Sequence, residues 1–421
     1  MPILNEIAKL NKVLILGFAR EGQSTLNFLR SRFPYLQIDT ADQKDGPDYL
    51  LHLKDYQIII KSPGISPHKP EIVAAQKAGT VFTSHTQIFF ENCPGKIIGV
   101  TGTKGKSTTA SLIHHVLAAN DCRSVLVGNI GRPALDFLPE ITADTWVAME
   151  LSSYQLMNLN ISPHIAVLQN IYPDHLDYHQ SFQEYVEAKR NIARYQKPDD
   201  YFIYNNDFPL SAQTAEITPA KKIPFSLLDY DRTISAQLLG EHNKYNILPS
   251  VFVGKILGLS ISQIYYAIST FKPLDTRLQP VAEVSGIRFF EDTLATIPEA
   301  TIAALDALSP DVDTLIAGGY ERKQNYLYLA QKILDSHIKT LIVFPATGPR
   351  IWEEIKNIQS KPSIIYHQAK SMSDAVKFAA SHTSPGKICL LSPAAPSFTL
   401  FKDYRDEGRQ YRDALLSAAG I

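Results

Sequence analysis

The 421-residue sequence predicts an α/β protein of three domains. Short apolar segments rich in Val, Ile and Leu alternate with helical patterns. This alternation is typical of parallel sheets with helices on both faces. The clearest predicted strands are 13–17, 57–60, 96–100, 146–149, 166–168, 314–319, 340–344 and 388–391. A length of roughly 150 residues per domain also suggests three domains.

Two breaks rich in turn-forming residues divide the chain. Asn-Cys-Pro-Gly at 92–95 ends the first series of strands and helices, and Phe-Lys-Pro at 271–273 ends the second. We therefore expect an N-terminal domain at 1–92, a central domain at 93–273 and a C-terminal domain at 274–421.

Composition narrows the class of protein. The sequence holds 41 Lys+Arg and 42 Asp+Glu, and a net charge of -1 argues against a general nucleic-acid binder. The sequence lacks both an apolar run of the ~18–20 residues that span a bilayer and a signal-peptide pattern at its start. Cys93, Cys122 and Cys389 are scattered, as in a reducing compartment. We expect a cytoplasmic protein without nucleic-acid partners or membrane insertion.

The strongest local signal is Thr-Gly-Thr-Lys-Gly-Lys-Ser-Thr-Thr at 101–109, between a predicted strand and a predicted helix. Such a loop turns backbone N–H groups toward a phosphate. Lys106 would reach the outer phosphates and Ser107 would bind Mg²⁺. The loop departs from the full Walker A pattern because Val100 takes the place of the first glycine. A plain Gly-rich turn is the weaker alternative.

The first predicted strand also runs into a Gly-containing loop, at 17–24. The loop fails the Gly-x-Gly-x-x-Gly pattern of dinucleotide sites because Ala19 replaces the second glycine. Asp42 lies 25 residues beyond Gly17, close to where an acidic residue would meet a ribose or base. A nucleotide site and an ordinary tight turn both remain open.

Polar residues follow other predicted strands. Glu150 ends one strand, where a carboxylate can hold Mg²⁺. His175 follows another strand beside carboxylates, although a lone histidine is usually a surface residue. Lys189 falls in an amphipathic helix, and its charge pattern alone predicts a solvated lysine. Asn243 and Asn246 lie on neighbouring helical turns, suited either to an adenine edge or to capping and turn chemistry.

Taken together, these motifs resemble the Mur ligase family, the ATP-dependent peptide ligases of peptidoglycan precursor synthesis. The resemblance spans nearly the whole chain. Its motifs are 102–108, Gly-Asn-Ile-Gly at 128–131, Glu-Leu-Ser-Ser at 150–153, Asp174-His175, Ala188-Lys189, His242-Asn243 with Asn246, and Arg277. Residues 62–65, 153–156 and 391–398 are most similar to the glutamate-adding branch of the family.

The resemblance implies a Rossmann-like N-terminal domain that binds UDP, a central P-loop ATPase domain and a Rossmann-like C-terminal domain that binds glutamate. It implies an ADP-forming ligase that joins glutamate, with D-glutamate favoured, to UDP-N-acetylmuramoyl-L-alanine through an acyl phosphate. We expect ATP, two Mg²⁺ ions and a monomer.

The resemblance also assigns residues to each ligand. The ATP residues are Gly102, Thr103, Lys104, Gly105, Lys106, Ser107, Thr108, Asn243, Asn246, Arg277 and Asp292. The UDP-substrate residues are Ala19, Arg20, Asp42, Ser62, Gly64, Asn129, Ser152 and Gln155. The glutamate residues are Thr296, Arg322, Lys323, Ser397, Phe398 and Tyr404. Ser107 and Glu150 would hold one Mg²⁺, and His175 and a carbamylated Lys189 would hold the other. The catalytic residues implied by the resemblance, called the catalytic set below, are Lys106, Glu150, His175 and Lys189.

The C-terminal domain departs from the family pattern. Leu294 and Ile297 stand where relatives commonly carry lysine and asparagine. An L-glutamate-adding version of the same ligase is therefore the main alternative. A ligase similar to folylpolyglutamate synthetase and a non-catalytic nucleotide-binding homologue are more remote alternatives. The non-catalytic alternative conflicts with the retention of all four residues of the catalytic set.

Overall fold

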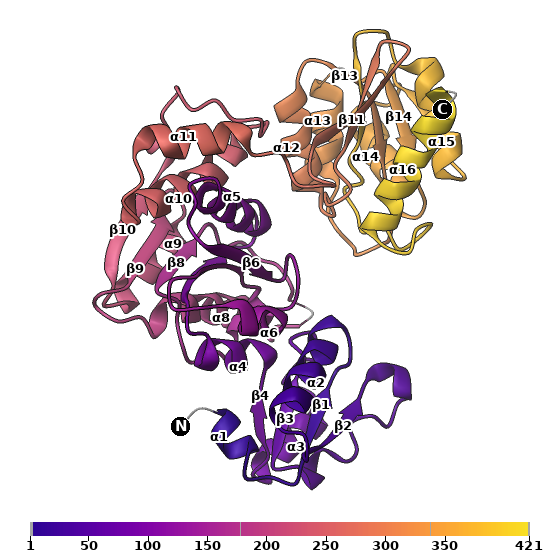
Figure 1. Ribbon diagram of the computed structural model, residues 1–421. Helices are drawn as coiled ribbons and strands as arrows, with labels where there is room; N and C mark the ends of the chain where they lie inside the picture. Colours follow the sequence, from indigo (N-terminus) through magenta and orange to yellow (C-terminus); the bar gives the residue numbers. More distant parts are fainter. Residues whose placement is uncertain (1–2, 177, 337, 420–421) are drawn as a thin grey trace. The chain divides into compact units, whose positions relative to one another are not determined.

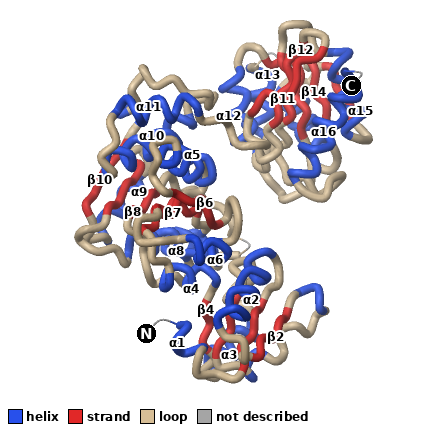
Figure 2. Tube along the Cα trace, viewed as in Figure 1, coloured by secondary structure: helices blue, strands red, loops and turns tan. Residues whose placement is uncertain are grey.

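Three β-sheets organise the chain in the computed structural model, which describes residues 3–176, 178–336 and 338–419 (Figure 1). The chain forms two compact units: residues 1–235 with 244–271, and residues 236–243 with 272–421. The first unit contains two sheets and the second contains one. In Figure 2, helices flank the strands of each sheet. The predicted α/β class with three sheets is confirmed, whereas the exact domain boundaries remain predictions.

The first sheet has four parallel strands in the order β2-β1-β3-β4. Its strands are β1 (Lys12–Leu16), β2 (Gln37–Ala41), β3 (Ile58–Lys61) and β4 (Val81–Thr83). Its helices are α1 (Ile3–Ile7), α2 (Arg20–Arg32), α3 (Pro70–Lys77) and α4 (His85–Asn92). Every residue of β3 is buried, as its continuous apolar run predicts for a central parallel strand.

The second sheet has six parallel strands in the order β10-β9-β8-β5-β7-β6. Its strands are β5 (Lys96–Thr101), β6 (Ser124–Gly128), β7 (Trp146–Glu150), β8 (Ile165–Leu168), β9 (Tyr201–Asn205) and β10 (Lys221–Phe225). The associated helices are α5 (Lys106–Ala118), α6 (Ala134–Phe137), α7 (Ser153–Leu156), α8 (Phe182–Arg194), α9 (Pro209–Thr214), α10 (His242–Ile256) and α11 (Ile261–Thr270). The order reverses around β5, and ligands of open α/β sheets bind at such a point, beyond the carboxyl ends of the strands.

The third sheet has the order β11-β12-β16-β13-β14-β15 and is parallel except for β11. Its strands are β11 (Gln279–Val284), β12 (Ile287–Glu291), β13 (Val312–Ala317), β14 (Thr340–Val343), β15 (Ile365–Gln368) and β16 (Ile388–Leu391). Its helices are α12 (Pro298–Leu308), α13 (Leu327–Asp335), α14 (Thr347–Ile358), α15 (Met372–His382) and α16 (Tyr404–Ala419). A two-residue turn at Ser285-Gly286, with both φ angles positive, joins β11 to β12 as a hairpin.

The predicted strand at 314–319 extends too far at its carboxyl end. The strand β13 ends at Ala317, and Gly318 turns away with a φ of 103°.

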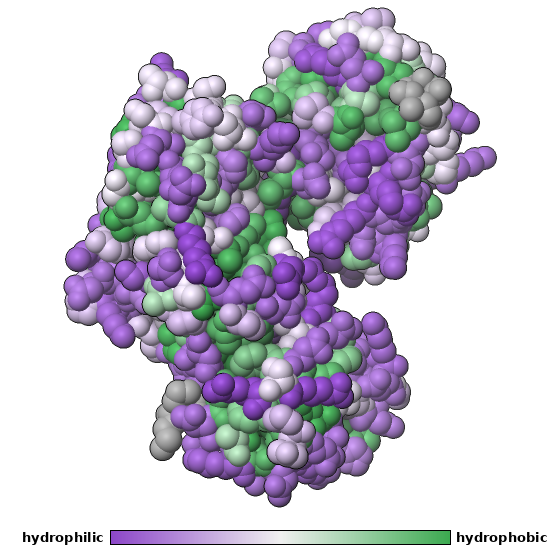
Figure 3. Space-filling view, viewed as in Figure 1, coloured by the Kyte–Doolittle hydropathy of each residue, from purple (hydrophilic) through white to green (hydrophobic). Residues whose placement is uncertain are grey.

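Hydrophilic side chains cover much of the face displayed in Figure 3. Within the described ranges, the structure holds no helix long and apolar enough to cross a membrane.

Candidate active site

The loop after β5 has the shape of a phosphate cradle. Gly102 and Gly105 adopt positive φ angles of 154° and 85°, and Gly105 precedes the first turn of α5. Asn170, from the loop after β8, fixes this shape: its carbonyl accepts from the Thr103 N–H at 2.7 Å, and its Oδ1 accepts from the Lys104 N–H at 2.8 Å. The first turn of α5 therefore begins with Lys106 and Ser107 beside N–H groups suited to an anion.

Two polar side chains from neighbouring strands meet beside this loop. Glu150, at the end of β7, is 2% exposed. Its Oε1 accepts from Asn129 Nδ2 at 3.2 Å, whereas its buried Oε2 has no hydrogen-bond partner within the described part of the chain. A buried carboxylate oxygen without a donor is costly unless a cation binds it.

Lys189 is buried, contrary to the solvated lysine that its charge pattern alone predicts. Its side chain is only 1% exposed and lies on the inner face of α8. The Nζ donates to the carbonyl of Gly102 at 2.8 Å and lies 4.8 Å from the ring centre of Tyr185. Burial, followed by the nearby charge of Lys106, lowers the pKa of Lys189 well below its usual value. The charge pattern failed here because Lys189 is buried by the packing of α8 on the phosphate loop, which the spacing of charges along the helix does not indicate.

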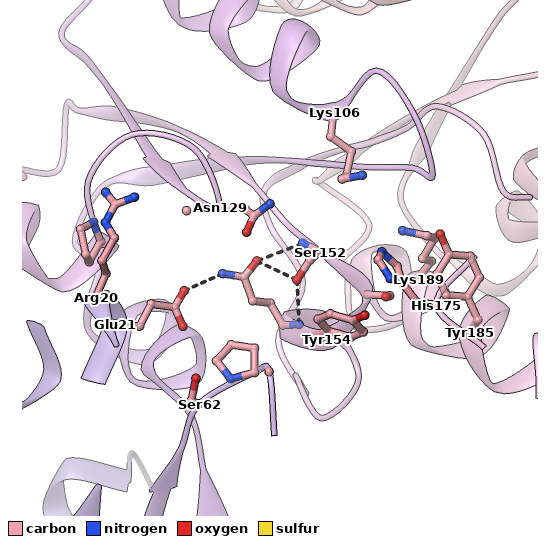
Figure 4. A pocket seen from close by; sticks show the side chains of 16 residues that line it. Arg20, Glu21, Ser62, Lys106, Asn129, Ser152, Tyr154, His175, Tyr185 and Lys189 are labelled. Carbon is pink, nitrogen blue, oxygen red and sulfur yellow. Dashed lines mark hydrogen bonds between the residues drawn. The ribbon is translucent and has the colours of Figure 1, made fainter. Parts of the chain in front are cut away.

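A single pocket joins residues of the first sheet to this phosphate loop (Figure 4). Its lining consists of Arg20, Glu21, Ser62, Pro63, Gly64, Lys106, Gly128, Asn129, Pro133, Ser152, Ser153, Tyr154, Gln155, His175, Tyr185 and Lys189. Arg20, Glu21 and Ser62 lie toward one end in Figure 4, and His175, Tyr185 and Lys189 lie toward the other. The pocket therefore brings together six of the eight residues assigned to the UDP substrate and two of the four assigned to metal binding, His175 and Lys189. Ser107 and Glu150 are not among its lining residues.

The other residues assigned to the UDP substrate lie around the first loop. Ala19 precedes α2, and Arg20 donates to the carbonyl of Gly131. Asp42 accepts from the backbone N–H groups of Phe18 and Lys44, and these two hydrogen bonds lower the pKa of its carboxyl. Asp42 thus shapes the loop and is absent from the lining of the pocket.

His175 and the neighbouring carboxylate lie in the loop after β8. The φ angle of His175 is 55°, and the ring lies 4.9 Å from that of Tyr154. Asp174 Oδ2 lies 3.5 Å from Lys104 Nζ, so the second lysine of the phosphate loop faces a carboxylate. Charges of Lys104 and His175 outweigh burial and lower the pKa of Asp174.

The two asparagines assigned to adenine lie at the start of α10, as predicted. Asn246 packs on the phosphate loop: a Cβ added to Gly105 would lie 2.1 Å from its Oδ1. Only glycine therefore fits at position 105 with Asn246 in this place. Asn243 Nδ2 donates to the carbonyl of Leu239 at 2.6 Å, which is the capping chemistry left open as an alternative.

Loops from the third sheet also converge at the carboxyl ends of its strands. Tyr320 donates its N–H to the carbonyl of Pro396 at 2.6 Å, and Gln324 Nε2 donates to the carbonyl of Thr296 at 3.2 Å. The loop after β13 therefore contacts both the loop after β16 and the segment after β12. Thr296 and Ser397 belong to these contacting loops.

The remaining residues assigned to glutamate differ in exposure. Arg322 and Lys323 are exposed, Phe398 is 57% exposed and Tyr404 is half-buried at the start of α16. The Phe398 ring lies 6.3 Å from that of Tyr320. Exposed cations beside an aromatic pair are suited to an anionic small molecule.

Asp292, which directly follows β12, is largely buried, with 9% of its surface exposed. Its Oδ2 accepts from Ser392 Oγ at 3.1 Å and its Oδ1 from the Leu278 N–H at 3.2 Å. Burial outweighs the hydrogen bond from Ser392 and the charge of Arg277, and raises the pKa of Asp292 to about 7. Asp292 therefore anchors the segment 276–278, in which Thr276 and Leu278 have positive φ angles.

Several lining residues were assigned no role by the sequence analysis, and two of them, Glu21 and Tyr185, make contacts that shape the site. Glu21 accepts from Gln155 Nε2 at 2.8 Å, and its Oε2 is buried without a partner among the residues the structure describes. Tyr185 Oη lies 2.9 Å from Thr103 Oγ1, which ties α8 to the phosphate loop. Tyr185 lies four residues before Lys189 and therefore on the same helical face, so spacing could have identified it. No comparable signal marks Glu21.

The residues present fit one Mg²⁺ ion beside bound phosphates. Mg²⁺ prefers oxygen ligands, and the Ser107 hydroxyl and the partnerless Oε2 of Glu150 are of this type. The residues proposed for a second Mg²⁺, His175 and Lys189, fit the ion only if Lys189 is chemically modified. The amine of Lys189 is a poor ligand for a hard cation, whereas a carbamate formed on it would supply oxygens.

The fold and this pocket define a nucleoside-triphosphate-binding α/β protein. A family model described as "Mur ligase middle domain" matches residues 100–232. UDP-N-acetylmuramoylalanine–D-glutamate ligases of Clostridium kluyveri and Listeria innocua are each 34% identical. The alignment to the first covers 87% of this chain and 84% of the relative, and that to the second covers 96% of both. This chain belongs to the Mur ligase family and is an ATP-dependent peptide ligase.

Solved structures share the fold at low identity. UDP-N-acetylmuramate–alanine ligase of Thermotoga maritima has a TM-score of 0.63 at 15% identity, over 97% of this chain and 99% of the other. MurF of Acinetobacter baumannii has a TM-score of 0.60 at 16% identity, over 80% of this chain and 87% of the other. These matches confirm the three-sheet architecture.

Proposed function

We propose that this Mur ligase joins D-glutamate to UDP-N-acetylmuramoyl-L-alanine at the cost of ATP, in peptidoglycan precursor synthesis in the cytoplasm. The observation that carries the proposal is the continuous pocket from Arg20 and Ser62 to Lys106 and Lys189. A nucleotide-linked substrate bound along this pocket would place its acyl end beside the phosphate loop. The relatives named above are D-glutamate ligases, and this chain aligns with them over most of their length.

The reaction needs activation because a carboxylate has no good leaving group. Transfer of the γ-phosphoryl group gives an acyl phosphate, whose phosphate leaves when the amine of glutamate attacks. The N–H groups of residues 102–107 and the ammonium of Lys106 bind the phosphates and offset their charge as the two anions approach. Asn170 keeps the loop in the binding shape.

Ser107 and Glu150 would hold one Mg²⁺, and His175 and carbamylated Lys189 would hold a second. Bound Mg²⁺ supplies positive charge between the substrate carboxylate and the γ-phosphate. Burial supports the carbamate, because a desolvated lysine spends more time as the neutral amine that reacts with CO₂. Tyr185 and the Gly102 carbonyl hold the Lys189 side chain in line with the loop.

The acceptor site comprises the loops after β12, β13 and β16. Thr296, Ser397 and one of the two cations Arg322 and Lys323 bind the glutamate carboxylates, with Phe398 and Tyr404 beside them. Leu294 and Ile297 stand where relatives commonly carry lysine and asparagine. These two differences do not change the residues proposed here to bind the glutamate carboxylates. For the nucleotide, the resemblance favours Asn243, Asn246, Arg277 and Asp292 as further ATP residues.

The test is phosphate release from ATP and Mg²⁺ with UDP-N-acetylmuramoyl-L-alanine and, in separate reactions, D-glutamate, L-glutamate or folates. We expect release with D-glutamate and much slower release with L-glutamate. Both carboxylates can stay fixed only if the amine moves, and a displacement of about 1 Å can cost ~100-fold in rate. Faster release with L-glutamate would contradict the proposed acceptor, and release only with folates would contradict the proposed nucleotide substrate.

A further inference from the structure

A buried acid lies behind Ser397 and has no role in the function proposed above. Glu407, in the first turn of α16, is fully buried. Its Oε2 shares a hydrogen bond with Ser397 Oγ, and its Oε1 has no partner in the described part of the chain. Among the residues that the structure describes, Ser397 is therefore the one hydrogen-bond partner of the Glu407 side chain.

The charges around Glu407 oppose its ionisation. Glu291, at the end of β12, is also buried and forms an ion pair with Arg412. A Cβ at position 408 would lie 2.0 Å from Glu291 Oε1, so glycine there lets the Glu291 carboxylate lie against α16 beside Glu407. Asp406 adds a second negative charge from α16. Arg412 is engaged by Glu291, and Glu407 has no ion pair of its own among the described residues.

Burial is the dominant influence on this carboxyl. It raises the pKa of Glu407 to about 8. The hydrogen bond with Ser397 is the next largest influence and opposes this rise, and the charges of Glu291 and Asp406 add smaller effects that support it. The amino end of α16 favours a negative charge, but this influence is weaker than the burial of a carboxylate without a cation. At neutral pH the acid is therefore mostly protonated.

The proton decides the direction of the hydrogen bond. A hydroxyl has a single hydrogen to donate. An ionised Glu407 would take that hydrogen, and Ser397 could then only accept. A protonated Glu407 donates to Ser397 Oγ, and the hydroxyl hydrogen can point elsewhere.

We propose that Glu407 is a positioning residue, protonated in the folded protein, that makes Ser397 a hydrogen-bond donor to a carboxylate of the acceptor amino acid. The inference rests on the proposed function, since it needs Ser397 in the acceptor site. It assigns Glu407 an influence on acceptor binding and none on ATP. Ionisation of Glu407 weakens acceptor binding by removing the donor from Ser397 and by adding a negative charge behind it.

The experiment measures the KM for D-glutamate from pH 6.5 to 9 in the full-length wild type, Glu407→Gln, Ser397→Ala and the double variant. Glutamine has nearly the same shape as glutamate, stays neutral and can donate to Ser397 at every pH. We expect the ratio of KM values, wild type over Glu407→Gln, to rise about tenfold across this range. Titration of the glutamate amine and of other site residues affects both proteins and cancels in the ratio.

Three controls keep the result specific. Glu283→Gln removes an exposed carboxyl of β11 in the same unit, and its KM ratio to wild type should stay flat. In the Ser397→Ala background, adding Glu407→Gln should leave the pH profile of KM unchanged, because the hydroxyl whose hydrogen-bond direction Glu407 controls is absent. The KM for ATP reports whether each variant folds.

The outcomes separate the two proposals. A flat ratio in an active enzyme, or a rising ratio that persists without the Ser397 hydroxyl, overturns the role of Glu407 and leaves the ligase function intact. Absence of D-glutamate ligation by the wild type at every pH overturns the proposed function and with it this inference.

Discussion

The second and third sheets both gather polar side chains at the carboxyl ends of their strands, but they bury different charged groups. The second sheet buries Lys189 beside Lys106, with one carboxylate oxygen of Glu150 left open. The third buries Asp292, Glu291 and Glu407, and internal hydrogen bonds or an ion pair hold each of them. One edge is prepared for anionic phosphates, and the other supports neutral hydroxyl donors. The same architecture thus serves two sites because the side chains at the strand ends and on the adjoining helices, and not the strand order, set the charge.

The largest expected effect is on the phosphate side. Lys106→Ala should lower phosphate release about 1000-fold, because it removes a cation from the phosphates in the transition state. Circular dichroism should show an intact fold, since the side chain lines the pocket. Lys104→Ala is the matched control from the same loop; its ammonium faces Asp174, and we expect a loss of only about tenfold. Equal losses in both variants would erase the distinction between these lysines.

Lys189 tests the same edge by chemical rescue. Lys189→Ala should be at least about 100-fold slower, because the oxygens of the carbamate are lost. Acetate or another small carboxylate should restore part of the activity by occupying the space the side chain leaves. Lys106→Ala should gain nothing from acetate. Full activity of Lys189→Ala would disprove the carbamate.

Substitutions in the proposed acceptor site should raise the KM for D-glutamate and leave the KM for ATP unchanged. Replacing the cation that binds glutamate, by either Arg322→Ala or Lys323→Ala, should raise the KM for D-glutamate about tenfold, as expected for loss of a charged hydrogen bond. The other variant should change it little. Steady-state kinetics at saturating ATP distinguish the two exposed residues. An unchanged KM in both would remove this loop from the acceptor site.

The last expected effect, on stability and not on activity, is an opposite pH dependence in the two units. Burial lowers the pKa of His85 in α4 to about 4, so an unfolded chain binds its proton first and the first unit loses stability as pH falls from 6.5 to 4. Burial raises the pKa of Glu407 to about 8, so the second unit loses stability as pH rises from 4.5 to 8. Each pKa unit corresponds to about 1.4 kcal/mol.

Scanning calorimetry of the full chain between pH 4.5 and 8 can measure both trends. His85→Gln should reduce the acidic loss and Glu407→Gln the alkaline loss, which also assigns the transitions. Part of each loss should remain, because His179 in the first unit has a pKa lowered to about 4 and Asp292 in the second has a pKa raised to about 7. The lowered carboxyl pKa values of the second unit, such as that of Asp313, act below pH 4 and do not interfere. Transitions that shift in the same direction with pH would contradict the contrast between the two units.

Sequence reasoning worked best where function depends on neighbours in the chain. The loop at 101–109 was identified because strand, glycines, lysine and helix follow one another, and the structure shows that order. Its Gly105 is required by a side chain 141 residues away, Asn246, and this reason was invisible in the sequence. For Lys189 the local pattern gave the wrong prediction, because its charge pattern alone predicts exposure. Only the family resemblance indicated that Lys189 is functional.

The acceptor side was less accessible to prediction. Thr296, Ser397 and the residues of the 318–326 loop are far apart in the sequence and follow no spacing rule, and only the resemblance named them. Glu407 was missed entirely, because an acidic residue in the first turn of a helix usually faces solvent and stabilises the helix dipole.

The sequence by itself determined the α/β class, the phosphate loop and most of the strands. These depend on short-range patterns: continuous apolar runs for buried parallel strands, and glycines followed by a helix for an anion site. The tertiary structure alone decided which charged groups lose their water. Lys189, Glu150 and Glu407 are all charged residues whose burial the local sequence pattern does not indicate. Burial by distant segments, which changes the free energy of a charge more than any neighbour in the chain does, gave each its distinct chemistry.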